Sequence, residues 1–152
     1  MKRILCYGDS NTWGFIPGSG KRYPSDVRWT GVMSKALGEE YEVIEAGLNG
    51  RTTVYPDPFN DLLNGLEFLP MILVQSKPLD LIILSLGTND LKFVSALHSA
   101  RGVGKLIETC KNCEVGFDRK HCAAILLEDI RKITLSLACG DYRPVVERVL
   151  YM

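Results

Sequence analysis

The chain has 152 residues, of which 46% are apolar and 24% are charged. This composition is typical of a globular domain that is long enough to bury a core. Eighteen basic and eighteen acidic residues leave no net charge, so we expect neither nucleic acid nor a membrane surface as a partner.

The sequence carries no signal for a membrane or for secretion. No apolar run reaches the roughly 18 residues that span a bilayer. The apolar stretch after Lys2 and Arg3 is interrupted at Gly8, which is too early for a signal peptide. The five cysteines are an odd number, which is not typical of a disulfide framework. We therefore predict a cytoplasmic protein with a single domain over residues 1–152.

Strands and helices alternate along the chain. The apolar run 3–7 predicts a first strand, and a helix follows over 27–38, with Val32, Ala36 and Leu37 on one face. The later elements are predicted as strands over 41–46, 79–86 and 123–127 and as helices over 66–76 and 94–110. This order predicts an α/β fold, with a parallel sheet covered by helices on both faces in three α/β/α layers.

Two of the predicted strands end in side chains that suit acyl-transfer chemistry. The first strand leads into Gly8-Asp9-Ser10-Asn11, and the strand 79–86 leads into Gly87-Thr88-Asn89-Asp90. In open parallel sheets, ligands bind at the carboxyl ends of the strands. A serine hydroxyl there needs a base to take its proton, and the oxyanion that forms needs fixed donors. Either motif alone would be a weak signal, because these are ordinary turn residues.

Together with Gly50, these motifs resemble the first three blocks of the SGNH (GDSL-type) hydrolases. The arylesterase and acyltransferase branch is the closer match, over residues 3–10, 26–31 and 45–53. The resemblance is dense to about residue 95 and thins out to about residue 127. It implies the flavodoxin-like SGNH hydrolase fold, a small-molecule ester as substrate, and neither a metal nor an organic cofactor. Self-association into a homo-oligomer stays open.

The resemblance also assigns catalytic roles. It implies that Ser10 is the nucleophile. The oxyanion donors would then be the backbone N–H groups of Ser10 and Gly50 and the side-chain amide of Asn89. The carboxyl ends of parallel strands share one edge of a sheet, so we expect these groups to meet there.

Other polar and aromatic residues near these motifs are candidates for the substrate site or for its support. Asp9 is expected chiefly to stiffen the turn that presents Ser10. Asn11 is expected to shape the site entrance, and Trp13 to wall an acyl or alcohol pocket. Asp90 is expected to organise its loop as Asp9 does. Arg51 is either a solvated charge or a brace for the loop of Gly50.

The general base is the open question. The resemblance implies an Asp-x-x-His pair late in the chain, and Asp118 and His121 have that spacing. However, they precede the predicted strand 123–127, whereas the family's pair follows a fifth strand. This order would place them at the opposite edge of the sheet. His98, the other histidine, has no carboxylate nearby in the sequence.

The tail 128–152 does not resemble the closing segment of the family. We therefore expect the last strand and helix of the fold to be missing. Truncation or a change of reading frame would explain this, and a native but divergent tail is the alternative. One function follows if a base is present: a serine hydrolase that hydrolyses or transacylates small carboxylic esters through an acyl-serine intermediate. The alternative is a catalytically impaired remnant without the Asp-His pair, acting at most as a binding or structural module.

Two further functions are disfavoured. Cys110, Cys113, His121 and Cys122 are possible zinc ligands, but their spacing matches no common zinc module, so free thiols are favoured. A nucleotide-binding protein would need a Gly-rich phosphate loop after a strand. Neither strand-end motif has that pattern.

Overall fold

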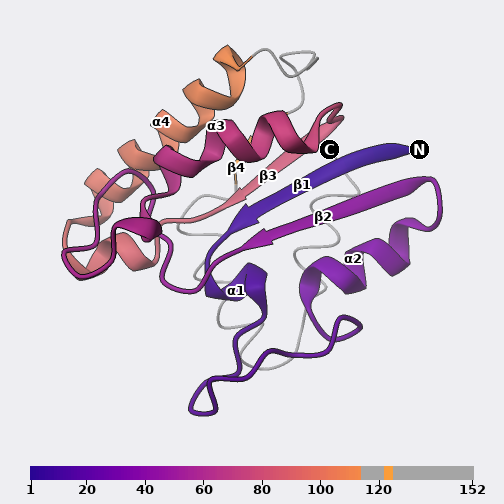
Figure 1. Cartoon of the computed structure of the whole chain (residues 1–152), viewed down its shortest axis with the longest axis horizontal. Coiled ribbons are helices and arrows are strands. Elements are labelled where there is room, and N and C mark those ends of the chain that lie inside the picture. The colour runs from indigo at the N-terminus through magenta and orange to yellow at the C-terminus, as the bar shows by residue number, and fades with distance from the viewer. Residues whose placement is uncertain (114–121, 125–152) are drawn as a thin grey trace.

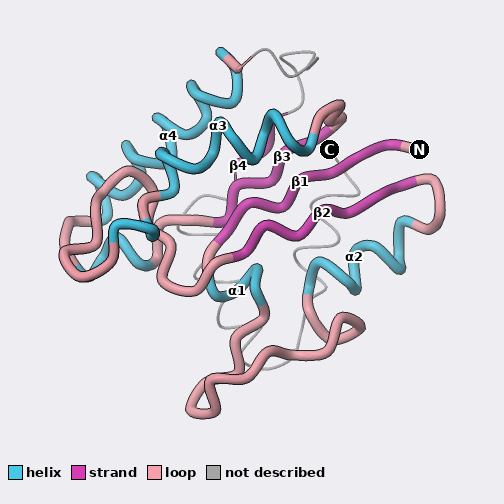
Figure 2. The backbone as a smooth tube through the Cα atoms, in the orientation of Figure 1, coloured by secondary structure: helices cyan, strands magenta, loops and turns pink. Residues whose placement is uncertain are grey.

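A computed structural model of the chain describes residues 1–113 and 122–124. Its elements alternate as the sequence predicts (Figures 1 and 2). The strands are β1 (Lys2–Gly8), β2 (Tyr41–Gly47), β3 (Leu81–Ser85) and β4 (Cys122–Ala124). The helices are α1 (Ser10–Trp13), α2 (Trp29–Leu37), α3 (Gly65–Ser76) and α4 (Ala96–Asn112), with short 3-10 helices η1 (Asp61–Leu63) and η2 (Asn89–Lys92).

The four strands form one parallel sheet in the order β2-β1-β3-β4. β1 pairs with β2 on one side and with β3 on the other, so it lies inside the sheet. The predicted parallel α/β fold is thereby confirmed. The prediction that the last strand and helix are missing concerns residues outside the described part of the chain.

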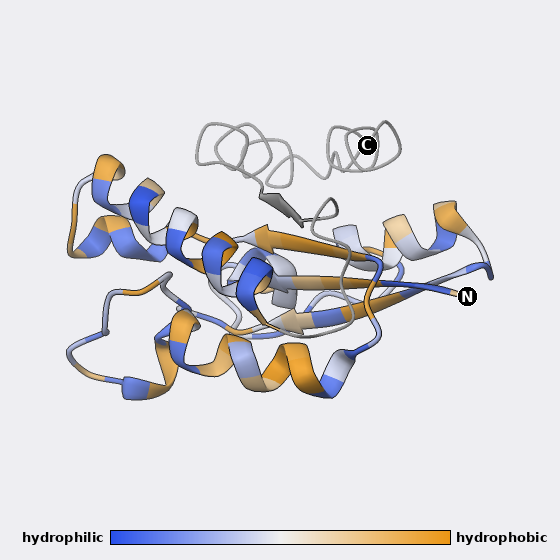
Figure 3. Cartoon of the chain, turned by 90° about the horizontal axis from the view of Figure 1, so that it is seen from above, coloured by the Kyte–Doolittle hydropathy of each residue, from blue (hydrophilic) through white to orange (hydrophobic). Residues whose placement is uncertain are grey.

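Helices pack on both faces of the sheet because β1 and β3 are apolar on both faces. Leu5 and Tyr7 of β1 belong to a core cluster with residues of α3 and α4. Ile4 and Cys6, which alternate with them, belong to a second cluster with residues of α2. Successive side chains of a strand point to opposite faces, so α2 covers one face and α3 and α4 cover the other. The apolar strands run through the middle of Figure 3.

Helix α2 buries a different face from the one predicted. Its buried apolar side chains are Trp29 and Met33, and Leu37 packs partly buried against the same cluster. Ala36, which was predicted on the core face, is exposed. The helix begins at Trp29, and residues four apart lie on one helical face. The larger apolar area of Trp29 and Met33 therefore sets the orientation of the helix.

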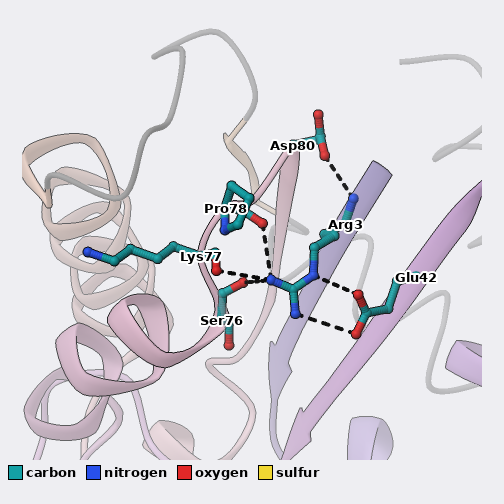
Figure 4. A network of polar contacts seen from close by, with 6 residues as sticks. All are labelled: Arg3, Glu42, Ser76, Lys77, Pro78 and Asp80. Carbon is teal, nitrogen blue, oxygen red and sulfur yellow. Dashed lines mark hydrogen bonds and ion pairs between the residues drawn. The ribbon is translucent and has the colours of Figure 1, made fainter. Parts of the chain in front are cut away.

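Arg3 joins three segments at the amino-terminal edge of the sheet (Figure 4). Its Nε donates to Glu42 Oε2 of β2 at 2.6 Å, and its backbone N–H donates to Asp80 Oδ2 at 2.8 Å. Its Nη1 donates to the carbonyls that lead from α3 toward β3, at 2.6, 3.1 and 3.4 Å for Ser76, Lys77 and Pro78.

Within residues 1–113 and 122–124, none of the helices combines the length and apolarity that crossing a membrane requires.

Candidate active site

The site is built where three strands end together. Gly8 at the end of β1 is in register with Gly47 of β2 and with Ser85 of β3. Ser10, Gly50 and Asn89 each follow one of these ends by a few residues. The three segments therefore leave the sheet at the same edge, where the arrowheads of β1 and β2 approach α1 (Figure 1).

The turn that carries Ser10 is fixed by Asp9. The Asp9 carboxylate accepts a hydrogen bond from the backbone N–H of Asn11 at 2.9 Å, which caps α1. The backbone N–H of Asp9 donates to Ser85 O at 3.3 Å, which joins the turn to β3. Ser10 is the first residue of α1 and is partly exposed. The nucleophile candidate is thus held in a turn that is bonded to the neighbouring strand.

Asp9 is buried to an unusual degree for a carboxylic acid, with 1% of its surface exposed. Burial raises the pKa of Asp9 to about 6, although the hydrogen bonds from Asn11 and the charge of Arg51 act in the opposite direction. Such a side chain offers little surface to a ligand. The position of Asp9 suits a residue that stabilises the turn of Ser10.

Two glycines allow α1 to lie against the strand ends. A Cβ added at Gly8 would lie 2.0 Å from Thr12 Oγ1, and one added at Gly47 would lie 2.2 Å from the backbone N of Trp13. Any side chain at either position would push α1 away from the sheet.

The loop after β2 turns at Gly50, whose φ of +82° is in the left-handed region that favours glycine. Two hydrogen bonds hold this loop. The Arg51 N–H donates to Leu48 O at 3.1 Å, and the Leu48 N–H donates to Gly8 O at 3.1 Å. The segment that presents Gly50 is therefore bonded directly to the end of β1.

Arg51 is buried, with 6% of its surface exposed. Its Nη1 donates to Gly8 O at 3.0 Å and to Ala46 O at 2.5 Å. Its guanidinium carbon lies 4.1 Å from the centroid of the Tyr7 ring, a cation–π distance. Of the two alternatives for this residue, solvated charge and brace, the structure shows the brace.

The loop after β3 is bonded to the loop after β2. The side-chain amide of Asn89 donates to Arg51 O at 3.1 Å. Asp90 is fully buried and accepts hydrogen bonds from the backbone N–H and the hydroxyl of Thr53. Burial raises the pKa of Asp90, and the hydrogen bonds from Thr53 oppose this shift. These contacts bring the segments of Asn89 and Gly50 together.

Trp13 lies at the end of α1, three residues beyond Ser10, and is partly exposed. Arg22, which lies in the loop between α1 and α2, contacts Trp13. The guanidinium carbon of Arg22 lies 5.2 Å from the centroid of the Trp13 ring, and Arg22 Nε donates to Trp13 O at 2.6 Å. Glu45 of β2 forms ion pairs with Arg22 at 3.1 Å and with Arg28 at 2.9 Å. The sequence did not single out this polar cluster, because its members are far apart in the chain.

Of the candidates for the general base, His98 alone lies within the described residues. His98 is exposed in α4, and its Nδ1 lies 2.8 Å from Ser95 Oγ. No hydrogen bond between His98 and Ser10 occurs in the part of the chain that the structure describes. Asp118 and His121 lie outside the described residues. β4 begins directly after them in the sequence, with Cys122 in register with Ile82 of β3.

Three of the cysteines have described side chains. Cys6 and Cys110 are buried and Cys113 is partly buried. Among residues 1–113 and 122–124, no group of three or more His, Cys, Asp or Glu side chains could hold a metal ion.

Comparison with known proteins identifies similar sequences and structures. The model of the GDSL-like lipase/acylhydrolase family matches residues 6–137. A carbohydrate acetylesterase from Sinorhizobium meliloti is 40% identical over 82% of this chain, with a TM-score of 0.77. The native aryl esterase of M. smegmatis is 34% identical over 95% of this chain, with a TM-score of 0.77.

The lengths of these proteins differ from that of this chain. The chain covers 63% of the acetylesterase and 79% of the aryl esterase. A second carbohydrate acetylesterase family member from Sinorhizobium meliloti is 30% identical, with a TM-score of 0.73, over 97% of this chain and 79% of its own. A search of curated protein sequences gives no match.

Proposed function

The chain belongs to the GDSL-like lipase/acylhydrolase family, and on this premise we propose that it is a serine esterase of small carboxylic esters with Ser10 as the nucleophile. The observation that carries the proposal is the register of Gly8, Gly47 and Ser85, which brings the three motif segments to one edge of the sheet. The known structures named as esterases support the reaction class.

In the proposed reaction, Ser10 Oγ forms a bond to the acyl carbon of the ester and loses its proton to a base. The alcohol leaves with a proton, and an acyl-serine ester remains. Water then releases the acid, or another alcohol takes the acyl group. Transfer to such an acceptor differs from hydrolysis only in the second nucleophile.

The proposed oxyanion donors are the N–H groups of Ser10 and Gly50 and the side-chain amide of Asn89. An amide nitrogen carries two hydrogens. One hydrogen of Asn89 Nδ2 is directed to Arg51 O, which leaves the other for a developing oxyanion. Each donor that is held in place contributes about 3 kcal/mol to stabilisation of the transition state.

The substrate surface that we propose lies along α1. Asn11 and Trp13 are both partly exposed there, on the same short helix as Ser10. We assign Asn11 to the entrance and Trp13 to the wall of the pocket, and we assign Asp9 to the turn itself because it is buried. No cofactor enters this proposal.

A second candidate function is a catalytically impaired member of the family that binds esters without turning them over efficiently. One observation favours it. Strand β4 begins at Cys122 opposite Ile82, near the amino-terminal end of β3, whereas Ser10 lies at the carboxyl edge. Asp118 and His121 directly precede this strand in the sequence, whereas the family resemblance implies an Asp-His pair that follows a strand.

Substitution of Ser10 tests the proposed nucleophile. We expect Ser10→Ala to abolish turnover of p-nitrophenyl acetate and to change the free energy of unfolding by only about 0.5 kcal/mol, because Ser10 is partly exposed. A fluorophosphonate probe should label the wild-type chain at Ser10. Ser19→Ala, in an exposed loop, is the matched control and should be labelled like the wild type. Undiminished turnover by Ser10→Ala would exclude this mechanism.

A further inference from the structure

Arg51 contacts several segments at the carboxyl edge of the sheet. Its Nη1 donates to carbonyl oxygens from two strands, Gly8 O of β1 at 3.0 Å and Ala46 O of β2 at 2.5 Å. Gly8 immediately precedes the turn of Asp9 and Ser10. The Arg51 side chain therefore fixes the point from which the proposed nucleophile leaves the sheet.

The backbone of Arg51 contacts the other half of the site. Its carbonyl accepts a hydrogen bond from Asn89 Nδ2 at 3.1 Å. Its N–H donates to Leu48 O at 3.1 Å, which closes the turn at Gly50. One residue thus touches all three segments that the proposed reaction uses.

An arginine suits this position for physical reasons. Its planar guanidinium can donate to two acceptors at once and stack on an aromatic ring, and here it lies 4.1 Å from the Tyr7 centroid. The charge of Arg51 also favours the ionised form of the buried Asp9 carboxylate, and that carboxylate favours the charged form of Arg51. A lysine would keep the charge but lose the planar group that stacks on Tyr7.

We infer that Arg51 is a positioning residue for acyl transfer, which holds the Ser10 turn and the Asn89 amide in one fixed arrangement without touching the substrate. This inference rests on the proposed function. It predicts that loss of the side chain slows the reaction of Ser10 much more than it weakens substrate binding.

Arg3 provides a matched control at the opposite edge of the sheet. It also joins β1 to β2 and donates to several carbonyl oxygens (Figure 4). Arg3→Met removes an arginine that bridges the same two strands but lies far along β1 from Ser10. It should lower thermal stability and leave the reactivity of Ser10 unchanged.

The first measurement is the rate at which a fluorophosphonate probe labels Ser10, together with kcat and KM for p-nitrophenyl acetate. We expect Arg51→Met to lower the labelling rate and kcat by about a hundredfold, as displacement of a reacting group by about 1 Å does. KM should stay within about twofold of the wild-type value. The labelling rate and kcat of Arg51→Lys should lie between those of the wild type and those of Arg51→Met. Arg51→Lys serves as the test variant if Arg51→Met does not fold.

The second measurement does not depend on activity. Hydrogen exchange followed by NMR reports on the Leu48 N–H, which is bonded to Gly8 O, and on the Asn89 side-chain amide. Both should exchange at least about tenfold faster in the Arg51 variants than in Arg3→Met. Unchanged exchange in the Arg51 variants would overturn the inference, as would an equal loss of labelling in Arg3→Met. If wild-type Ser10 is not labelled at all, the proposed function fails, and the exchange rates still decide whether Arg51 holds these segments.

Discussion

Asp9 is a carboxylic acid held out of water next to the proposed nucleophile. Its side chain is 1% exposed, and its pKa is raised from 3.8 to about 6, first of all by burial. The folded protein therefore binds the Asp9 proton more tightly than the unfolded chain does. As the pH rises through the interval from about 4 to 6, the ionised carboxylate lowers the stability of the fold.

Asp9→Asn should remove this pH dependence. As the pH rises from about 4 to about 6, the free energy of unfolding of the variant should increase relative to that of the wild type. One pKa unit corresponds to about 1.4 kcal/mol, so the change is on the order of 2–3 kcal/mol. Urea denaturation at several pH values measures it, with Asp26→Asn in an exposed loop as the matched substitution. A difference that stays constant with pH would show that Asp9 ionises alike in both states.

The sequence predicts the identities of these polar residues better than their environments. The strand-end motifs are local patterns, so Asp9, Asn89 and Asp90 could be placed near a site from the sequence alone. That Asp90 is fully buried and bonded to Thr53 depends on how two loops approach each other. No local pattern contains that information.

Helix α4 carries two glycines with opposite surroundings. A Cβ added at Gly102 would lie 2.0 Å from Thr53 Oγ1 and 2.9 Å from Thr53 Cβ, whereas one added at Gly104 would meet no atom within 4 Å. Glycine lowers helix propensity at both positions. At Gly102 the absence of a side chain allows α4 to approach the loop after β2 closely. At Gly104 no neighbouring segment of the described chain requires the absence of a side chain.

The two substitutions should therefore change stability in opposite directions. Gly104→Ala should raise the free energy of unfolding by about 0.5–1 kcal/mol through helix propensity. Gly102→Ala should lower it by about 1–3 kcal/mol, because the new methyl group displaces Thr53 and strains its hydrogen bonds to Asp90. Chemical denaturation compares both variants with the wild type. Equal stabilisation by both would mean that α4 does not rest on Thr53.

At the scale of elements, the sequence predicts β1, β2, β3, α2, α3 and α4 to within a few residues, but it does not predict the short helix α1 that begins at Ser10. The apolar runs are bounded by Gly, Pro, Asn and Asp, which mark ends reliably. The predicted orientation of α2 was wrong, because the apolar pattern of Val32 and Ala36 competes with that of Trp29 and Met33. Which of the two faces packs on the sheet depends on how much apolar area the sheet can cover. The helix sequence alone does not specify this area.

At the scale of the whole molecule, the activity depends on whether a general base reaches Ser10. Ser10 lies at the carboxyl edge of the sheet, and the described histidine, His98, is bonded to Ser95. We expect esterase turnover to be slow and to change by less than about threefold in His121→Ala. His98→Ala is the matched variant and should behave likewise. Loss of a working triad base costs about a thousandfold or more, so a loss of that size in His121→Ala would establish a complete hydrolase.

The position of β1 in the sheet has a consequence for the order in which the chain acquires structure. β1 precedes its partners in the sequence, yet Ile4 pairs with Val43 on one side and with Leu81 on the other. Pairings between distant segments form slowly, because a long loop must close before any contact is gained. During synthesis, a ribosome must add residue 85 before both sides of β1 can be paired. We therefore expect the turn that bears Ser10 to form late in folding, although it is encoded near the beginning of the sequence.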